Sequence, residues 1–323
     1  MVASNHEVVI TARKKEVTYD LLDAYNIPYT ERGAGKNSMV GKLTYLPKAN
    51  YILYKTAKKF KPDVFLSFSS PYAAQVSKLF GKPHIALDDT EHASLGRLMY
   101  RPFTDTVLSP KCFKGKISKK QVLFNGYLEL CYLHPNYFTP DESILDLLNV
   151  NIGEQFSLLR FVSWRATHDA GHKGLTDQKK RLAVQEFSQY GKVFISSEAD
   201  LPEDLQQYKI NIPPHRMHDA INYASLLWGE SATMASEAAV LGVPAVYLDN
   251  DGRGYTDELE KEYGLVFNYT ESSEDQTKAI EKGAELLKNP NSKEIFIKKR
   301  NRMLEEKVDV LSFIIDYVMS FKK

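Results

Sequence analysis

The segment between residues 225 and 248 restricts the fold of this chain more than any other part of the sequence. Two short apolar runs flank a turn of small residues and an alanine-rich stretch. Ser231 and Thr233 are both suitable helix N-caps, and Gly242 followed by Pro244 is a typical helix end. The pattern therefore predicts a strand, a turn, a helix and a second strand, which together form one βαβ unit of a parallel sheet.

The turn of this unit is suited to binding an anion. Peptide N–H groups at the start of a helix lack partners within the helix and lie at the positive end of its dipole. The side chains of Ser231, Ala232 and Thr233 are small enough to let a diphosphate approach those groups. Glu237 follows about one turn later, where its carboxylate can accept hydrogen bonds from the hydroxyls of a sugar. The alternative is a capped helix that packs on the sheet through its alanines and binds nothing.

Apolar strand patterns alternate with helical patterns along most of the chain, which predicts an α/β fold with doubly wound parallel sheets. We expect strands at 7–12, 63–67, 84–87, 106–108, 121–124, 156–162 and 193–195, and helices at 17–25, 43–60, 72–80, 177–190 and 215–223. A chain of 323 residues is long enough for two domains of about 150 residues each. We place the domains at 1–150 and 151–323, joined by a proline-containing linker.

Charge and cysteine content exclude several classes of protein. The 42 basic and 41 acidic residues leave a net charge of +1, so no overall field favours nucleic acid. Cys112 and Cys131 are too few for a disulfide framework and lack the spacing of a zinc site. No apolar run approaches the roughly 20 residues that span a bilayer, and the first residues lack a signal peptide's apolar core. We therefore expect a cytoplasmic protein.

Further segments carry a resemblance to a known family. They are Leu159–Trp164, His168–Gly174, Phe194–Glu198, Pro213–Asp219 and Gly252–Tyr255. Through them nearly the whole chain resembles an uncharacterised GT-B family of predicted glycosyltransferases, a domain of unknown function. That family is related to the non-hydrolysing UDP-N-acetylglucosamine 2-epimerases and to N-acetylglucosaminyltransferases. The resemblance implies two Rossmann-like domains with a cleft between them, the N-terminal one on the acceptor side and the C-terminal one binding a nucleotide sugar.

The resemblance also assigns residues and exposes one difference. In the related proteins the turn that matches Ser231, Ala232 and Thr233 holds the diphosphate, and the glutamate that matches Glu237 binds the ribose. The last helix, at about 307–321 here, packs back on the N-terminal domain. The strand at 7–12 matches the second strand of the family's fold, so the N-terminal domain lacks the family's first βα unit.

Loops that follow the predicted strands carry further candidate ligands, since ligands of open α/β sheets gather at the carboxyl ends of strands. Arg160 and Lys173 are candidates to neutralise a diphosphate leaving group, and Ser163 is a further candidate contact for the nucleotide sugar. Arg253 is a candidate contact for the donor's sugar, as the resemblance implies. The polar residues of the 215–223 helix are candidates to approach the nucleotide base, although a solvated surface helix has the same pattern: His215, Arg216, His218 and Asp219.

We expect no metal ion and no cofactor besides the UDP-sugar substrate. Asp249 and Asp251 have the D-x-D spacing of a metal pair, but the glycines that follow favour a turn. His168 and His172 lie four residues apart, but Gly171 between them disfavours a rigid helix and no third ligand is evident.

Asp89 and Glu91 are the candidate catalytic residues. With Asp88 they crowd negative charge at the end of the strand at 84–87, which raises the pKa of one carboxyl and suits a general base. The alternative is a helix N-terminus, with Asp89 or Thr90 as the cap and Glu91 in the first turn.

The function that we favour is metal-independent transfer of a glycosyl group from a UDP-sugar to an unknown acceptor. One alternative is a 2-epimerase of UDP-N-acetylglucosamine, although the position that matches a catalytic aspartate of those enzymes holds Ser70. Another is a non-catalytic nucleotide-sugar-binding protein or partner subunit. The apolar last helix also allows contact with a membrane surface as an alternative to burial.

Overall fold

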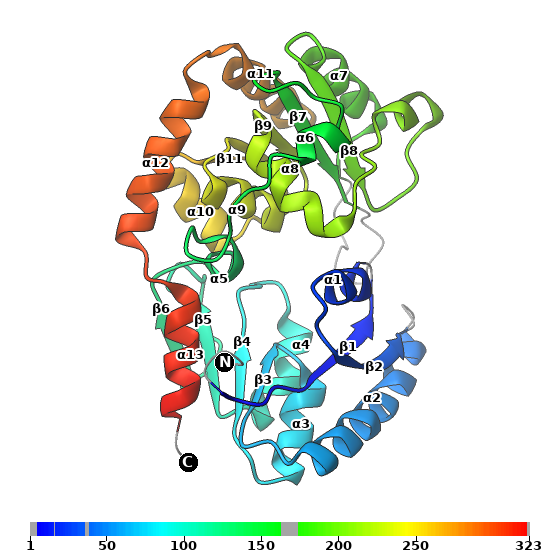
Figure 1. The fold of residues 1–323 in the computed structure, drawn as a ribbon, viewed down its shortest axis with the longest axis vertical. Helices are drawn as coiled ribbons and strands as arrows, with labels where there is room; N and C mark the ends of the chain where they lie inside the picture. The colour runs from blue at the N-terminus through cyan, green and yellow to red at the C-terminus, as the bar shows by residue number, and fades with distance from the viewer. Residues whose placement is uncertain (1–4, 16, 36–38, 163–173, 322–323) are drawn as a thin grey trace. The chain divides into compact units, whose positions relative to one another are not determined.

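The computed structural model describes residues 5–15, 17–35, 39–162 and 174–321. The chain forms two compact units: unit 1 comprises Met1–Phe124 and Leu311–Lys323, and unit 2 comprises Asn125–Val310. Both units alternate strands with helices (Figure 1). The division lies before residue 150 because two short helices after Phe124 pack within unit 2, one against the helix that follows Ser231 and the other against the helix that begins at Met217.

Unit 1 contains two separate parallel sheets. β1 and β2 form a two-stranded sheet, and the other strands form a four-stranded sheet in the order β3-β4-β5-β6. The strands are β1 Ile10–Lys14, β2 Tyr29–Ala34, β3 Phe65–Phe68, β4 His84–Leu87, β5 Thr106–Pro110 and β6 Gln121–Phe124. The helices are α1 Thr18–Ala24, α2 Met39–Phe60, α3 Pro71–Leu79, α4 Ser94–Tyr100, the 3-10 helix η2 Arg101–Phe103, and α13 Val310–Ser320.

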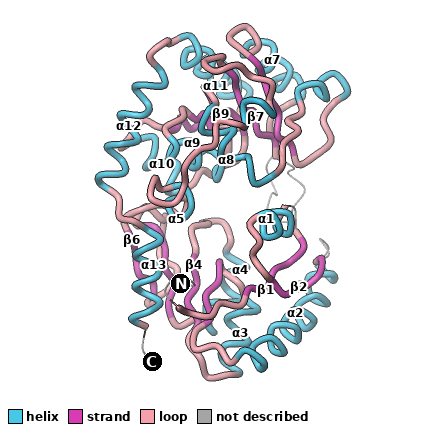
Figure 2. Tube along the Cα trace, in the orientation of Figure 1, coloured by secondary structure: helices cyan, strands magenta, loops and turns pink. Residues whose placement is uncertain are grey.

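The last helix, α13, lies near the C-terminus (Figure 2) and belongs to unit 1 from residue 311 onward. Ile314 and Val318 are buried, and the hydroxyl of Tyr317 donates to Oγ1 of Thr106 on β5 at 3.1 Å. The apolar face of this helix is therefore covered by protein, which supports burial over contact with a membrane surface. No helix in the described part of the chain is both long and apolar enough to cross a bilayer.

Unit 2 contains one five-stranded parallel sheet in the order β11-β10-β9-β7-β8. Its strands are β7 Phe156–Phe161, β8 Lys192–Ser197, β9 Leu226–Gly229, β10 Ala245–Leu248 and β11 Val266–Tyr269. Its α-helices are α5 Leu130–Leu133, α6 Ile144–Leu147, α7 Asp177–Phe187, α8 Met217–Tyr223, α9 Ala232–Leu241, α10 Gly254–Lys261, α11 Ser273–Lys288 and α12 Ser292–Glu306. Its 3-10 helices are η3 Glu203–Tyr208 and η4 Pro214–Arg216.

The strand order of unit 2 locates its ligand-binding edge. Numbered along the unit, the order is 2-1-3-4-5, so the direction of winding reverses between β7 and β9. Doubly wound sheets bind ligands outside the carboxyl ends of the strands at such a switch point. In this unit that position is where Phe161 ends β7 and Gly229 ends β9.

Candidate nucleotide site

The turn between β9 and α9 brings a helix N-terminus to the switch point. Gly229 has φ of 149°, and a Cβ atom there would lie 2.0 Å from the carbonyl oxygen of Arg160, so the close approach of β9 to β7 requires glycine. Ser231 is the N-cap and accepts from the N–H of Met234 at 3.3 Å, whereas Thr233 lies exposed in the first turn. Of the two predicted caps, Ser231 is therefore the one used.

The peptide N–H groups of this turn remain available to a ligand. Among the described residues, no acceptor binds the N–H groups of Ser231, Ala232 or Thr233. Ala232 is buried and Ser231 half-buried, and both side chains are small. The arrangement is chemically suited to a phosphate, since donors and the helix dipole act on the same point.

Glu237, one of the predicted site residues, has a buried carboxylate held by two side chains. It is 7% exposed, and its Oε1 lies 3.0 Å from the hydroxyl of Tyr132 and 3.0 Å from Nε2 of His218. The rings of Tyr132 and His218 lie 5.4 Å apart, and Phe138 meets His218 edge-on at 6.2 Å. No described residue donates to Oε2 of Glu237. One carboxylate oxygen is thus fixed in place by two side chains of the same unit.

Beside the turn, the carboxylate of Glu230 connects the end of β7 to the segment that precedes α7. It is 4% exposed, its Oε2 accepts from the N–H of Val162 at 3.0 Å, and its Oε1 accepts from the N–H of Leu175 at 2.6 Å. Its own N–H donates to the carbonyl of Arg160 at 2.9 Å. The sequence predicted no role for Glu230, although an acidic residue between a buried strand and an N-cap is a detectable signal. Tyr132 was not predicted either, because its position in the linker carries no such signal.

Of the three predicted nucleotide-sugar contacts near β7, only Arg160 lies within the described residues. Arg160 donates to Ser196 Oγ at 2.9 Å and forms an ion pair of 2.5 Å with Glu198, both at the end of β8. Its guanidinium is therefore already engaged by protein groups. Ser163 and Lys173 lie outside the described residues, as do His168 and His172.

The polar residues of the 215–223 segment separate into two roles. His218 contacts Glu237, as described above. Arg216 pairs with Asp219 at 2.7 Å, and Asp219 accepts from the N–H of Asp141 at 2.9 Å. Arg216 and Asp219 therefore connect α8 to the segment before α6.

Arg253 and Asp249 form a closed turn after β10. Asp249 is buried, its Oδ1 accepts from the N–H of Asp251 at 2.8 Å, and its Oδ2 accepts from the hydroxyl of Tyr247 at 2.5 Å. Arg253 lies 3.4 Å from the same Oδ2 and donates to the carbonyl of Gly252 at 2.7 Å. This geometry fits the expected turn. No group of three or more His, Cys, Asp or Glu is placed to hold a metal ion within the described residues.

The carboxylates after β4 lie in unit 1 and differ in their burial and in their hydrogen-bond partners. Asp88 is fully buried and accepts from the hydroxyl of Tyr100 and from the N–H of Thr90 at 3.0 Å. Burial raises the pKa of Asp89 to about 6, and the neighbouring charges of Asp88 and Glu91 add to the shift, although the hydroxyl of Thr90 opposes it. The pKa of Asp89 therefore lies nearer to neutral pH than that of an ordinary aspartate.

Glu91 is half-buried, and its Oε1 accepts from the N–H of Lys114 at 3.1 Å. The alternative interpretation of these carboxylates as a helix N-terminus is wrong, because α4 begins at Ser94 with Ala93 as its N-cap. The intervening residues form a turn whose carbonyls, at Thr90 and Glu91, accept from the guanidinium of Arg97.

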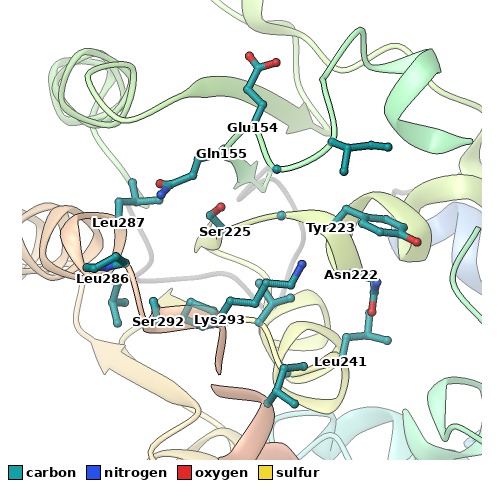
Figure 3. A pocket seen from close by; sticks show the side chains of 18 of the residues that line it. Glu154, Gln155, Asn222, Tyr223, Ser225, Leu241, Leu286, Leu287, Ser292 and Lys293 are labelled. Carbon is teal, nitrogen blue, oxygen red and sulfur yellow. The ribbon is translucent and has the colours of Figure 1, made fainter. Parts of the chain in front are cut away.

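Unit 2 contains a cavity of about 300 Å³ (Figure 3). It lies at the opposite edge of the sheet from the turn. Its lining includes Gln155, Ser225 and Pro244, the residues that directly precede β7, β9 and β10. Because the strands are parallel, their amino ends share one edge, and nucleotides bind at the other. This cavity is therefore not the candidate nucleotide site.

Comparison with known proteins identifies the family and the fold of the chain. A family model described as "Protein of unknown function (DUF354)" matches residues 3–319. No curated protein matches the chain.

Solved structures resemble the chain over almost its whole length. UDP-GlcNAc 2-epimerase from Neisseria meningitidis, bound to UDP-GlcNAc, has a TM-score of 0.69 at 13% identity, with 98% of this chain and 93% of that chain covered. A putative UDP-N-acetylglucosamine 2-epimerase from Listeria monocytogenes has a TM-score of 0.61 at 14% identity, with coverages of 96% and 88%. MurG from Acinetobacter baumannii has a TM-score of 0.57 at 15% identity, with coverages of 99% and 93%. The chain therefore has the GT-B fold of glycosyltransferases and these epimerases, as the family resemblance implied.

Proposed function

This chain belongs to the DUF354 family of proteins of unknown function, and we propose that it binds a UDP-sugar through unit 2 and transfers the glycosyl group without a metal ion. The observation that carries the proposal is the carboxylate of Glu237. Tyr132 and His218 both engage Oε1, so Oε2 is oriented and has no protein donor among the described residues. A carboxylate oxygen held in this way accepts well from a ribose hydroxyl, because hydrogen bonds to charged groups are the stronger ones.

The diphosphate binds at the N-terminus of α9 in this proposal. The N–H groups of Ser231, Ala232 and Thr233 supply donors, and the helix dipole supplies positive potential. These groups stabilise the charge that develops on UDP as the bond between the sugar's C1 and the phosphate oxygen breaks. Ser163 and Lys173 are further proposed contacts, and Arg253 a proposed contact to the sugar. Arg160 would have to leave Glu198 before it could bind a phosphate.

Asp89 is the residue that we propose as the general base, in preference to Glu91. It takes the proton of the acceptor's hydroxyl, whose oxygen then bonds to C1 of the sugar as UDP departs. A carboxyl with a pKa of about 6 is ionised at neutral pH yet more basic than an ordinary aspartate. Glu91 already uses Oε1 to bind the N–H of Lys114.

A mass-spectrometric assay with a panel of nucleotide sugars tests the proposal. Transfer releases free UDP only when an acceptor is present. Epimerisation, the alternative function, yields an altered sugar that is still attached to its nucleotide. Binding with neither product would indicate a non-catalytic protein, and absence of any binding would contradict the whole assignment.

The assay includes a matched pair of variants. Asp89→Asn should lower turnover by about 10²–10⁴ while UDP affinity stays unchanged, since only the proton acceptor is lost. Asp63→Asn is the control, because the side chain of Asp63 is 97% exposed. Equal activity of the two variants would show that Asp89 is not the base.

A further inference from the structure

The two units carry opposite net charges, although the whole chain is nearly neutral. Unit 1 contains 22 Lys and Arg against 11 Asp and Glu, a net charge of +11. Unit 2 contains 20 Lys and Arg against 30 Asp and Glu, a net charge of −10, which agrees with the +1 of the chain. A strongly basic domain favours ligands that carry negative charge. The basic side chains of unit 1 that lack acidic partners are therefore candidate contacts for an anion.

Arg13 and Arg32 are two such side chains, at the carboxyl ends of β1 and β2. Ala12 pairs with Glu31 in the parallel ladder, so the residues that follow them, Arg13 and Arg32, are neighbours on adjacent strands. Both arginine side chains are half-buried. No carboxylate among the described residues pairs with either guanidinium. Two positive charges therefore lie on neighbouring strands without a counter-charge from the described part of the protein.

Two tyrosines orient these guanidiniums. Arg13 lies over the ring of Tyr45, with its Cζ 5.3 Å from the ring centroid. Arg32 lies over the ring of Tyr72 at the same distance. The two rings meet edge-on at 5.7 Å, so the four side chains form one arginine–tyrosine cluster. Burial and the neighbouring Tyr45 raise the pKa of Tyr72, whereas the charges of both arginines oppose that rise, so both guanidiniums lie near the same phenol.

Three polar atoms of the arginine–tyrosine cluster are buried without a hydrogen-bond partner among the described residues. They are Nε of Arg13, Nε of Arg32 and the hydroxyl oxygen of Tyr45, a residue that is 6% exposed. Stacking on a ring does not satisfy the N–H groups of a guanidinium, which point outward in its plane. Charged donors that are removed from water without an acceptor are unfavourable. The cluster therefore lacks an acceptor group that a ligand can supply.

Space for a ligand exists beside the arginine–tyrosine cluster. Arg32 lines a cavity of about 510 Å³ in unit 1, together with Thr11 of β1 and Ser70, the N-cap of α3. Tyr72 follows this cap directly, so the cluster lies at the carboxyl end of β3. Because β3 and β4 are parallel neighbours, Asp89 follows β4 at the same edge. The cluster and the proposed general base thus share the ligand-binding edge of unit 1.

We propose that Arg13 and Arg32 bind a phosphate group, and that this group belongs to the acceptor of the glycosyl transfer. The second part rests on the proposed function, whereas the first part does not. A phosphate monoester carries about −1.5 to −2 charges at neutral pH and has three acceptor oxygens, so it matches two guanidiniums better than a carboxylate does. The acceptor then carries its phosphate beside the hydroxyl that Asp89 deprotonates.

Calorimetric titration with inorganic phosphate tests the site in the absence of donor and acceptor. The ionic strength is kept constant with sodium chloride, because salt alone weakens interactions between charges. Arg13→Gln combined with Arg32→Gln should weaken phosphate binding about tenfold or more, since charge-assisted hydrogen bonds are the stronger ones. Lys58→Gln combined with Lys59→Gln removes the same charge from exposed side chains in the last turn of α2 and should bind phosphate like the parent. Equal loss in both double variants would show that only the overall charge matters and would overturn the proposal.

Melting temperatures separate binding from a structural role of the arginines. Phosphate should raise the melting temperature of the parent and of the lysine variant by several degrees, and that of the arginine variant much less. A purely structural cluster predicts a lower melting temperature for the arginine variant without phosphate and the same rise with phosphate in all three proteins, which would contradict the inference. The parent alone provides a further measurement, since acetate at equal ionic strength should cause no rise. An equal rise with acetate would overturn the assignment to phosphate.

The transfer assay tests the second part of the proposal with two acceptors that differ only in one phosphate group, a hexose 6-phosphate and the free hexose. The parent should prefer the phosphorylated acceptor at least tenfold in kcat/KM, and the arginine variant should lose that preference. Transfer without such a preference would overturn the assignment of the site to the acceptor. Arginine-dependent phosphate binding without transfer from any donor would instead contradict the proposed function and support the phosphate site.

Discussion

Replacing Glu237 by glutamine tests the ribose contact directly. The variant keeps the size of a side chain that is 7% exposed, so the packing of α9 is preserved. It removes the charge of the carboxylate, whose Oε2 is the one available acceptor. A hydrogen bond to a charged group contributes about 1.5–3 kcal/mol, so affinity for UDP should fall roughly ten- to a hundredfold.

Tyr132→Phe should lower the affinity for UDP by a smaller factor, because it also weakens the contact between Glu237 and the ribose. It removes one of the two groups that hold Oε1, which loosens the carboxylate without removing it. A neutral hydrogen bond contributes about 0.5–1.5 kcal/mol, so the loss should be roughly two- to tenfold. Tyr127→Phe is the matched control, because it removes a similar hydroxyl-to-carboxylate bond, of 2.8 Å, to Glu258 on α10. That variant should bind UDP like the parent.

Titration calorimetry with two ligands distinguishes recognition from folding. UDP carries both ribose hydroxyls, and 2′,3′-dideoxy-UDP carries neither. The parent should prefer UDP, whereas Glu237→Gln should bind the two ligands almost equally. If the variant binds UDP like the parent, the ribose assignment is wrong. If its affinity falls equally for both ligands, the substitution acts through the shape of α9, and Glu237 does not recognise ribose.

Three further predictions concern stability and metal dependence. Gly229→Ala should lower the free energy of unfolding by about 1–3 kcal/mol or more, measured by denaturant titration, because its Cβ would meet the carbonyl of Arg160 at 2.0 Å; an unchanged midpoint would contradict the close strand contact. Burial lowers the pKa of His84 to about 4, so between pH 6.5 and 4 the unfolded chain binds a proton that the native chain does not. As the pH is lowered through this range, the free energy of unfolding of the parent should therefore decrease by up to about 3 kcal/mol relative to that of His84→Gln. Parallel pH profiles for parent and variant would refute this. EDTA should leave UDP affinity unchanged in calorimetry, and a loss that a divalent ion restores would assign a metal to Asp249 and Asp251 or to the histidines at 168 and 172.

The local sequence predicted most elements because their signals are short in range. The strand at 84–87 and the strand at 121–124 have the predicted bounds, and α9 ends at Gly242, which has φ of 80°. The ends of these elements depend on a few neighbouring residues, so they can be predicted without tertiary information. The predicted strand at 7–12 begins later than expected, because pairing needs a neighbour that no local pattern supplies.

By itself, the sequence determined the fold class and the turn at Ser231, since hydrophobic period and helix capping depend on residues close together in the chain. Only the tertiary structure decided which side chains support that turn. Tyr132 and Glu237 are separated by 105 positions, and Glu230 binds N–H groups 55 and 68 positions away. It also decided that the pKa of Asp89 is raised to about 6, because burial is a property of the folded chain. Such contacts arise when the strand order brings distant segments to one edge of a sheet. They cannot be predicted from the spacing of residues in the sequence.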